Sequence, residues 1–552
     1  MLIIFIILLK IDGIFCESYI TLKINKSGRY NILFKGGINV ENNECNGVSM
    51  HIPTSVIINN DNTVDPSLGE YDFNSEMNTI KIYFEESKDN YKCLFYGCSD
   101  IDEIDASHLY TSNVNNMDSM FNGCSSLTSI NLQNFDTSNV SYMFGMFRGC
   151  SSLQSLDLSS FNTEKVQNMR IMFGQCSSLQ TLNLSNFKTV NVFDIGYMFF
   201  QCISLISLDL SNFDTSNVIN MDLMFYNCTS LTTLNISNFK TEKVKNMRGM
   251  FAFCSSLTSL DLSHFYTPSL EDISFMFQGC KNLTSVNLAN FDTSNVSDMN
   301  WTFVECSSLI SLNISNFRTP KVIYMSGMFG DCSLITSLDL SKFDTSNVSY
   351  FNEMFSLCYS LVSLDLSNFN TKNTITMHGM FNYCINLISL DIHNFNTSLV
   401  ERMGWMFCNC HSLVSLDISN FNTKNVVDMR IMFGNCYSLT SLDLSHFDTS
   451  LVIDMGWMFF ECKNLISINL SSFNTSSVKE FDYMFYGCNL ITSLVLTNFN
   501  TSNVRNMRNM FLDCSSLITL DLSSFDTSNV DNMEWMFYEC YKLESLNISN
   551  FD

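Results

Sequence analysis

The sequence predicts an α/β solenoid, a body made by stacking one short structural unit many times. Cysteine recurs every 26 residues from Cys98 to Cys540, eighteen times, with no insertion or deletion. A fixed period of roughly 20 to 50 residues is typical of solenoids. The hydrophobic pattern between the cysteines also repeats with few lapses. Length therefore sets the number of stacked units, about 17 to 18, because each unit contacts only its neighbours.

Composition excludes some classes of partner. The 552 residues include 29 Lys and Arg against 54 Asp and Glu, which gives a formal net charge of -25. Binding to a phosphate backbone needs clustered cations, so we expect no nucleic-acid partner. The sequence contains no catalytic signature such as G-x-S-x-G, H-E-x-x-H or a phosphate-binding loop, and we expect no enzyme.

The first residues predict export. Residues 1–16 hold an apolar run too short to span a bilayer and read as a secretory signal peptide, with a buried N-terminal strand as the alternative. No other segment has the roughly 20 consecutive apolar residues of a membrane helix. We therefore expect a secreted or cell-surface protein.

Residues 17–91 lack the period and predict a small β-rich cap over the first unit. Short β-type runs are separated by turn residues, and they are Tyr19 to Ile24, Tyr30 to Lys35, Val56 to Asn59 and Thr79 to Glu85. Cys45 and Cys93 are the only cysteines between the signal and the repeats. They could form a disulfide in an oxidising compartment, and the sequence leaves the paired and unpaired states equally open.

Residues 92–552 form the repeat array, and the unit from Cys514 to Cys540 shows its pattern. Leucines alternate around Asp521, as in a short strand with one buried face. A Thr-Ser-Asn turn follows, suited to capping a helix. The next apolar residues are three, three, one and three positions apart, which predicts one face of a short helix, and they are Val530, Met533, Met536, Phe537 and Cys540.

Each unit is thus expected to be a strand, a turn and a short helix. Parallel strands stack at ~4.8 Å and helices at ~10 Å. The wider helical side would curve the array, with a parallel β-sheet on the concave side and the helices on the convex side. The strand begins as L-x-x-L-x-L in a 26-residue unit, which falls within the range of leucine-rich repeats.

The unit M-x-x-M-F-x-x-C-x-S-L-x-S-L-D-L-S-x-F-D-T-S-x-V resembles the bacterial surface protein 26-residue repeat, a relative of the BspA-like leucine-rich repeat family. The resemblance covers about five sixths of the chain. It implies an exported surface protein linked to adhesion. It implies no ligand.

The outward positions of the predicted strands are the candidate binding surface. Five residues after each repeat cysteine, from Ser129 onward, stands Ser or Thr; seven residues after it stands Asp or Asn, with Val495 as the exception. Five consecutive units carry aspartate, and we name them the aspartate block: Asp339, Asp365, Asp391, Asp417 and Asp443.

Carboxylates ~5 Å apart repel each other by roughly 1 to 4 kcal/mol. They should capture cations, raise their own pKa values or hydrogen-bond to the serine rows. The favoured interpretation is a solvated face that keeps the sheet from aggregating. A weak Ca²⁺ site and a direct ligand contact are the alternatives, and we expect no other cofactor.

For the cysteines and tryptophans we favour a structural role over a functional one. We expect the cysteine row to be buried free thiols, since disulfides between neighbours would pinch the units in pairs. Trp405 and Trp457 are candidate ligand contacts, although helix packing is the favoured interpretation. Asn-x-Ser/Thr sequons are frequent, so glycans are expected if the chain passes through a eukaryotic secretory pathway.

The sequence favours a non-enzymatic surface protein that adheres to protein or carbohydrate on a host, a matrix or another cell. The alternative is a structural coat of self-associating rods. The chain stops at Asp552 in mid-unit, so we expect either a fragment or a last unit that pairs with another copy.

Overall fold

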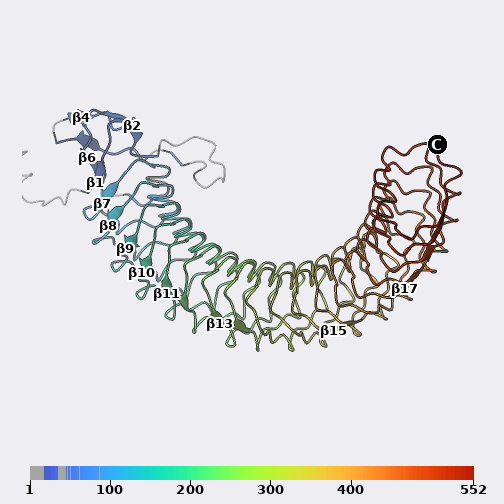
Figure 1. Ribbon diagram of the computed structural model, residues 1–552. Helices are drawn as coiled ribbons and strands as arrows, with labels where there is room; N and C mark the ends of the chain where they lie inside the picture. Colours follow the sequence, from blue (N-terminus) through green and yellow to red (C-terminus); the bar gives the residue numbers. More distant parts are fainter. Residues whose placement is uncertain (1–17, 35–44, 46–47, 50, 61, 86–87) are drawn as a thin grey trace, which may run out of the picture. The chain divides into compact units, whose positions relative to one another are not determined.

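The computed structural model is a β-solenoid of 26-residue turns, here called rungs (Figure 1). It describes residues 18–34, 45, 48–49, 51–60, 62–85 and 88–552. The expected signal peptide, residues 1–16, lies outside them. The chain divides into two compact units, Met1–Thr241 and Glu242–Asp552, each of which is described by itself.

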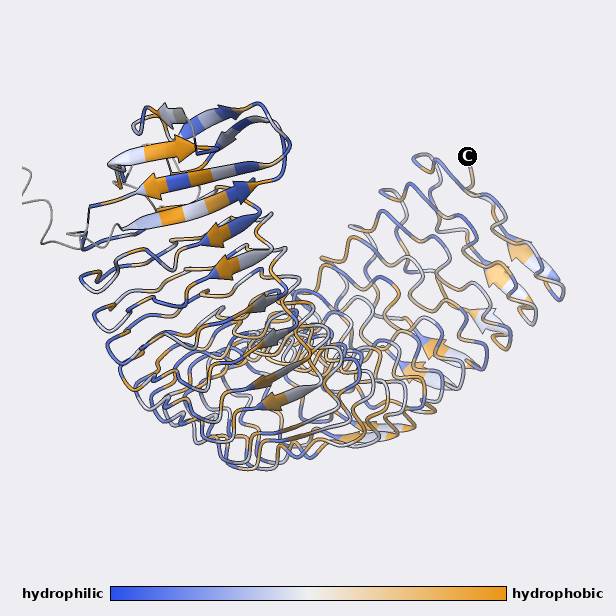
Figure 2. Ribbon diagram, turned by 90° about the vertical axis from the view of Figure 1, so that its left-hand side faces the viewer, coloured by the Kyte–Doolittle hydropathy of each residue, from blue (hydrophilic) through white to orange (hydrophobic). Residues whose placement is uncertain are grey.

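The cap contains six strands: β1 (Tyr19–Ile24), β2 (Gly28–Asn31), β3 (Ser55–Ile58), β4 (Asn62–Val64), β5 (Glu70–Phe73) and β6 (Asn78–Tyr83). Strand β1 pairs antiparallel with β6 on one side and with β7 (Glu103–Asp105) of the first rung on the other. The outer edge of the first rung is therefore covered. Figure 2 shows hydrophilic and hydrophobic residues alternating along these strands.

Most of the cap strands follow from sequence. The runs expected at residues 19–24, 56–59 and 79–85 coincide with β1, β3 and β6 to within two residues. The run from Tyr30 overlaps β2 only at its start. Strands β4 and β5 were not expected, although Tyr71 and Phe73 in β5 alternate and are buried.

In the repeats each strand has two or three residues. Its Leu, Ile or Val points inward, and the Ser or Thr before it and, in the three-residue strands, the Asp or Asn after it point out. The strands are β8 (Ser129–Asn131), β9 (Ser155–Leu156), β10 (Thr181–Leu182), β11 (Ser207–Asp209), β12 (Thr233–Asn235), β13 (Ser259–Asp261), β14 (Ser285–Asn287), β15 (Ser363–Asp365), β16 (Ser389–Asp391), β17 (Ser441–Asp443), β18 (Ser467–Asn469), β19 (Ser493–Leu494), β20 (Thr519–Asp521) and β21 (Ser545–Asn547). They pair in parallel, position for position.

The expected short helices are wrong: the described residues contain no helix. In the segment from Met377 to Cys384, alternate N–H groups donate to the next rung, as Phe381 does to the Met406 carbonyl at 2.9 Å. The N–H groups of Met380, Asn382 and Cys384 donate three residues back within the rung. Gly379 and Tyr383 both have φ of +61°, which an α-helix excludes.

The burial pattern behind that expectation is nevertheless present. Met377, Met380, Phe381 and Cys384 are all fully buried, because a chain that turns every four residues also brings positions three and four apart to one side. The sequence did contain a signal for these turns. Many rungs carry Gly, Asn or Asp either one or five residues before the cysteine, and φ is positive at both positions. Without helices, the argument that put the strands on an inner, concave side loses its basis.

Identical side chains stack along the interior. The rings of Phe355, Phe381 and Phe407 lie 5.7 and 5.8 Å apart and nearly parallel. Stacked aromatic pairs of this kind contribute about 0.5 to 1.5 kcal/mol each beyond the area that they bury. The methionines fill the space beside them.

A buried threonine joins each rung to the next. The Thr371 hydroxyl donates to the Asn396 carbonyl at 2.9 Å and accepts from the Asn396 N–H at 2.7 Å. The same pair of bonds recurs at Thr397 and Thr449. One side chain thus satisfies two backbone groups of the next rung, through hydrogen bonds that are partly shielded from water.

Replacing Thr371 with Val keeps the shape of the side chain and removes both bonds. Each lost hydrogen bond costs about 0.5–1.5 kcal/mol, so we expect a fall in the unfolding midpoint, measured by circular dichroism against temperature. Thr371→Ser keeps the hydroxyl and should stay near wild type. Thr440→Val, at an exposed position, should change the midpoint little; equal losses at the two threonines would contradict the assignment.

Candidate functional site

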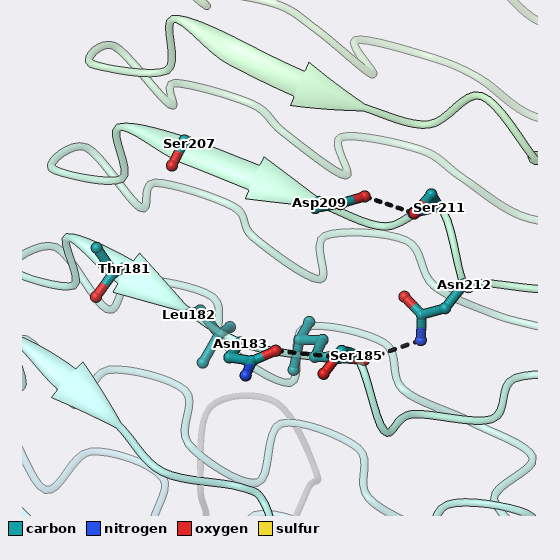
Figure 3. A pocket seen from close by; sticks show the side chains of 9 residues that line it. Thr181, Leu182, Asn183, Ser185, Ser207, Asp209, Ser211 and Asn212 are labelled. Atoms are coloured by element: carbon teal, nitrogen blue, oxygen red, sulfur yellow. Dashed lines mark hydrogen bonds between the residues drawn. The ribbon is translucent and has the colours of Figure 1, made fainter.

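The exposed ends of the strands form a polar surface along the rungs of each unit. Figure 3 shows it at β10 and β11, where an open pocket is lined by Ser, Thr, Asn and Asp side chains. The Asp209 carboxylate accepts a hydrogen bond from the Ser211 N–H at 2.9 Å. Asn183 does the same for Ser185 at 3.1 Å. Asp and Asn therefore play one structural role here, which is to fix the turn that follows the strand.

The aspartate block repeats this geometry in the second unit. Asp365 and Asp391 lie opposite each other in the β15–β16 ladder, and Asp443 ends β17. Asp339 and Asp417 occupy the same repeat position outside the assigned strands. A pocket in this region is lined by Asp365, Asp391 and Asp417 together with serines of β15 and β16.

The carboxylates of the block are hydrogen-bonded to the second residue that follows each of them. The N–H donors are Ser341, Ser367, His393, Ser419 and Ser445, at 3.0 to 3.3 Å. These bonds, from the side chains and N–H groups of those residues, hold the pKa of each aspartate below its usual range. The pKa values of the aspartates therefore shift in the direction opposite to the rise that charge repulsion alone would produce. Of the alternatives that the sequence left open, hydrogen bonding of the aspartates to serine fits this geometry.

The geometry supplies one carboxylate per rung. Among the described residues no three His, Cys, Asp or Glu side chains come together as a set that could hold a metal ion. Weak Ca²⁺ binding by the aspartate block stays a prediction.

Trp457 belongs to a packed cluster rather than standing alone. Its indole N–H donates to Asp482 at 2.6 Å, and its ring stacks on Tyr483 with centroids 4.1 Å apart. Trp405 is half-buried at the equivalent turn position two rungs earlier, and its backbone N–H donates to the Arg430 carbonyl at 3.0 Å. The structure does not bring either tryptophan together with the aspartate block, and helix packing does not explain them.

Sequence reasoning missed an arginine clasp that spans three rungs. Arg430 reaches over Gly456 to Asp482, at 3.5 Å, and also contacts Asp454 at 3.0 Å. Burial raises the pKa of Asp454, against the opposing effects of the Gly456 N–H and Arg430. A Cβ on Gly456 would overlap the Asp482 carboxylate, so the clasp requires glycine there.

The first unit contains the same clasp, with Arg170, Gly196 and Asp222 at positions 260 residues earlier. Arg170 contacts Asp222 at 2.8 Å and Asp194 at 3.3 Å. The signal that could have revealed it is this recurrence: a rung with arginine, a rung with glycine and a rung with aspartate, all six residues before the cysteine.

The cysteines of the described residues form one disulfide and a set of thiols, almost all of them in the 26-residue row. Cys45 and Cys93 are joined, with Cα atoms 6.2 Å apart, and Phe34 packs against them. The repeat cysteines are reduced thiols. They donate to the carbonyl of a phenylalanine one rung before, as Cys384 does to Phe355 at 3.2 Å. Burial raises the pKa of Cys358 to about 12, so these thiols are protonated and pack as small apolar groups.

Acidification should destabilise the protein through the aspartate block. A carboxyl whose pKa is lowered by folding stabilises the fold at every pH above its ordinary pKa of ~3.9. That contribution disappears as the pH falls through the lowered pKa. Changing all five aspartates to Asn keeps the turns, as at Asn313 and Asn469, but removes the contribution of the charged carboxylates. We therefore expect a lower unfolding midpoint at neutral pH and a flatter fall at low pH.

Thermal unfolding followed from neutral pH to about pH 2 checks this. The reverse change, Asn313→Asp with Asn469→Asp, should steepen the fall at low pH. A slope that does not respond to either variant would show that the hydrogen bonds of the aspartates contribute nothing to stability.

Gly456→Ala should break the arginine clasp. The added methyl group must displace the Asp482 carboxylate or the Arg430 guanidinium, so we expect a loss of about 1–3 kcal/mol in the free energy of unfolding, measured by urea denaturation. Gly330→Ala is the matched control, because its Cβ would meet its neighbours at 3.4 Å or more. Equal effects at Gly456 and Gly330 would contradict the role of the clasp.

Comparisons with solved structures return leucine-rich repeat proteins at low similarity. A leucine rich cell surface protein from Faecalibacterium prausnitzii is 16% identical, with 70% of this chain and 83% of that chain covered and a TM-score of 0.27. A leucine-rich repeat protein from Eubacterium ventriosum is 13% identical, with coverage of 62% and 84% and a TM-score of 0.29. A leucine-rich repeat protein from Leptospira interrogans is 17% identical, with coverage of 63% and 86% and a TM-score of 0.22. At these scores the likeness supports no statement about binding.

No curated protein matches the chain. In the part of the chain that the structure describes, no helix has the length and apolar character needed to cross a membrane. One family model matches the repeats five times, at residues 89–207, 197–307, 271–388, 383–493 and 466–552. These matches run without a gap over the 26-residue rungs described above, and the chain therefore belongs to the family described as Mycoplasma protein of unknown function, DUF285.

Proposed function

We propose that the chain is an exported, non-enzymatic surface protein whose repeat array binds protein or carbohydrate on a host, a matrix or another cell. The observation that carries the proposal is the exposed strand face, a polar surface repeated at ~4.8 Å over an interior of stacked, fully buried side chains. A preordered surface binds without the entropy cost of ordering it. The resemblance to BspA-like surface proteins supports the same function.

Three features support binding over catalysis. The strand face has few groups that could act as nucleophile or base, since its aspartates are held in turns and their pKa values are lowered. The thiols are buried and protonated, so they are poor nucleophiles. The polar side chains are uniform from rung to rung, which suits an extended partner contacting several rungs at once.

Beads coated with the full chain test the proposal by their adhesion to mammalian cell monolayers and to collagen, fibronectin and mucin films. We expect adhesion to at least one surface. A triple variant should block the exposed strand face and abolish adhesion, because bulky cations replace small hydroxyls; it carries Ser363→Arg, Ser389→Arg and Ser415→Arg.

The matched control is Ile323→Arg, Ile375→Arg, Ile453→Arg, which adds the same charge at exposed positions after the turn and should keep adhesion. Beads that clump with each other but adhere to no film would indicate the coat function instead. Adhesion to none of the surfaces, or equal losses in the two variants, would overturn the proposal.

A further inference from the structure

A row of exposed aliphatic side chains runs beside the aspartate block. Four residues after each cysteine, from Ile310 to Ile518, every rung carries Ile, Val or Thr, and none carries a charge. In three successive rungs the residues are Val362, Ile388 and Val414, which we name the aliphatic stripe. Their exposed fractions are 44%, 55% and 50%.

The backbone holds the stripe in register. The Ile388 N–H donates to the Val362 carbonyl at 3.0 Å, so equivalent residues stack directly from rung to rung, ~4.8 Å apart. Ile310 and Ile466 extend the row on either side and are also exposed. Water-exposed aliphatic groups gathered in one row are unfavourable unless a partner covers them.

Other exposed apolar residues of this unit do not form such a row. The row seventeen residues after each cysteine includes exposed Ile323, Ile375 and Ile453, but Glu401 and Lys479 interrupt it. Only at Val362, Ile388 and Val414 do three successive rungs of this unit carry an aliphatic residue four residues after the cysteine, and these three rungs belong to the aspartate block.

The carboxylates run parallel to the stripe. Asp365, Asp391 and Asp417 stand three residues after the three aliphatic residues, and in each rung the aliphatic residue, the serine that follows it and the aspartate are all exposed. An open pocket lined by β15 and β16 includes all three aspartates. A partner lying along the solenoid would meet an apolar edge and an anionic edge at the same time.

Charge decides which partner fits. A second copy of this chain has a net charge of -25 and would bring carboxylates toward carboxylates. A partner with lysine or arginine would instead relieve the repulsion between neighbouring aspartates. Apolar side chains on the same partner would cover the stripe.

We infer that the aliphatic stripe and the adjacent aspartates bind a polypeptide segment carrying basic and apolar side chains together. This inference rests on the proposed binding function and names the class of partner. Recognition combines two contributions: burial of the aliphatic groups, which salt hardly affects, and charge attraction, which salt screens.

Fluorescence anisotropy with the full chain tests the inference, using a labelled twelve-residue peptide of alternating Val and Lys. We expect it to bind at least about tenfold more tightly than a Ser and Lys peptide of equal charge, while a Val and Glu peptide should not bind. A triple variant of the aliphatic stripe should bind the two lysine peptides with equal affinity; it carries Val362→Ser, Ile388→Ser and Val414→Ser.

Asp365→Asn, Asp391→Asn, Asp417→Asn should weaken binding and flatten its salt dependence, since Asn keeps the turns. The matched control Ile323→Ser, Ile375→Ser, Ile453→Ser should bind like wild type. Equal binding of the two lysine peptides, no binding of either, or an equal loss in the control would overturn the inference. If the beads adhere to a film but the peptides do not bind, the inference is wrong and the proposed function stands. If the peptides bind but the beads do not adhere, the proposed adhesion is wrong and the inference about the peptide stands.

Discussion

Hydrogen bonds between equivalent positions of successive rungs are the constraint on which the rest of the structure depends. Every second residue from Met377 to Tyr383 donates its N–H to the next rung, and the threonine row adds two more bonds per rung. Buried backbone groups must be paired. One inserted residue would shift every bond between two rungs, and this explains why the cysteine interval never departs from 26 residues.

The same constraint explains the uniform interior. Once the rungs are in register, each inward side chain meets the same residue of the rungs before and after it, so Phe stacks on Phe and each thiol reaches the carbonyl beside it. A residue of another size would leave a cavity or force a shift in two neighbours. Positions that face solvent do not share this limit, because nothing packs against them from outside.

The interior was predictable from sequence and the backbone path was not. Spacing identified Met380, Phe381 and Cys384 as buried, yet the same spacing suits a helix and a chain turning every four residues. The backbone tells them apart, through the positive φ at Tyr383, and in the sequence the sole signal was the Gly, Asn or Asp found one or five positions before many of the cysteines. For the aspartate block, the sequence located the carboxylates but not the lowered pKa values, which depend on where the following N–H groups point.

Variation between rungs is therefore informative only at the outward positions. An interior residue repeats because stacking requires it. Ile388 and Asp391 have no such requirement, since Gln180 and Asn183 fill the same positions in another rung of the same geometry. Where the outward residues of several successive rungs change together, packing inside the solenoid does not account for the change. Aliphatic residues and carboxylates coincide in three successive rungs of the second unit, that of Ile388 and its two neighbours, and this coincidence is the reason for placing the inferred partner on that face.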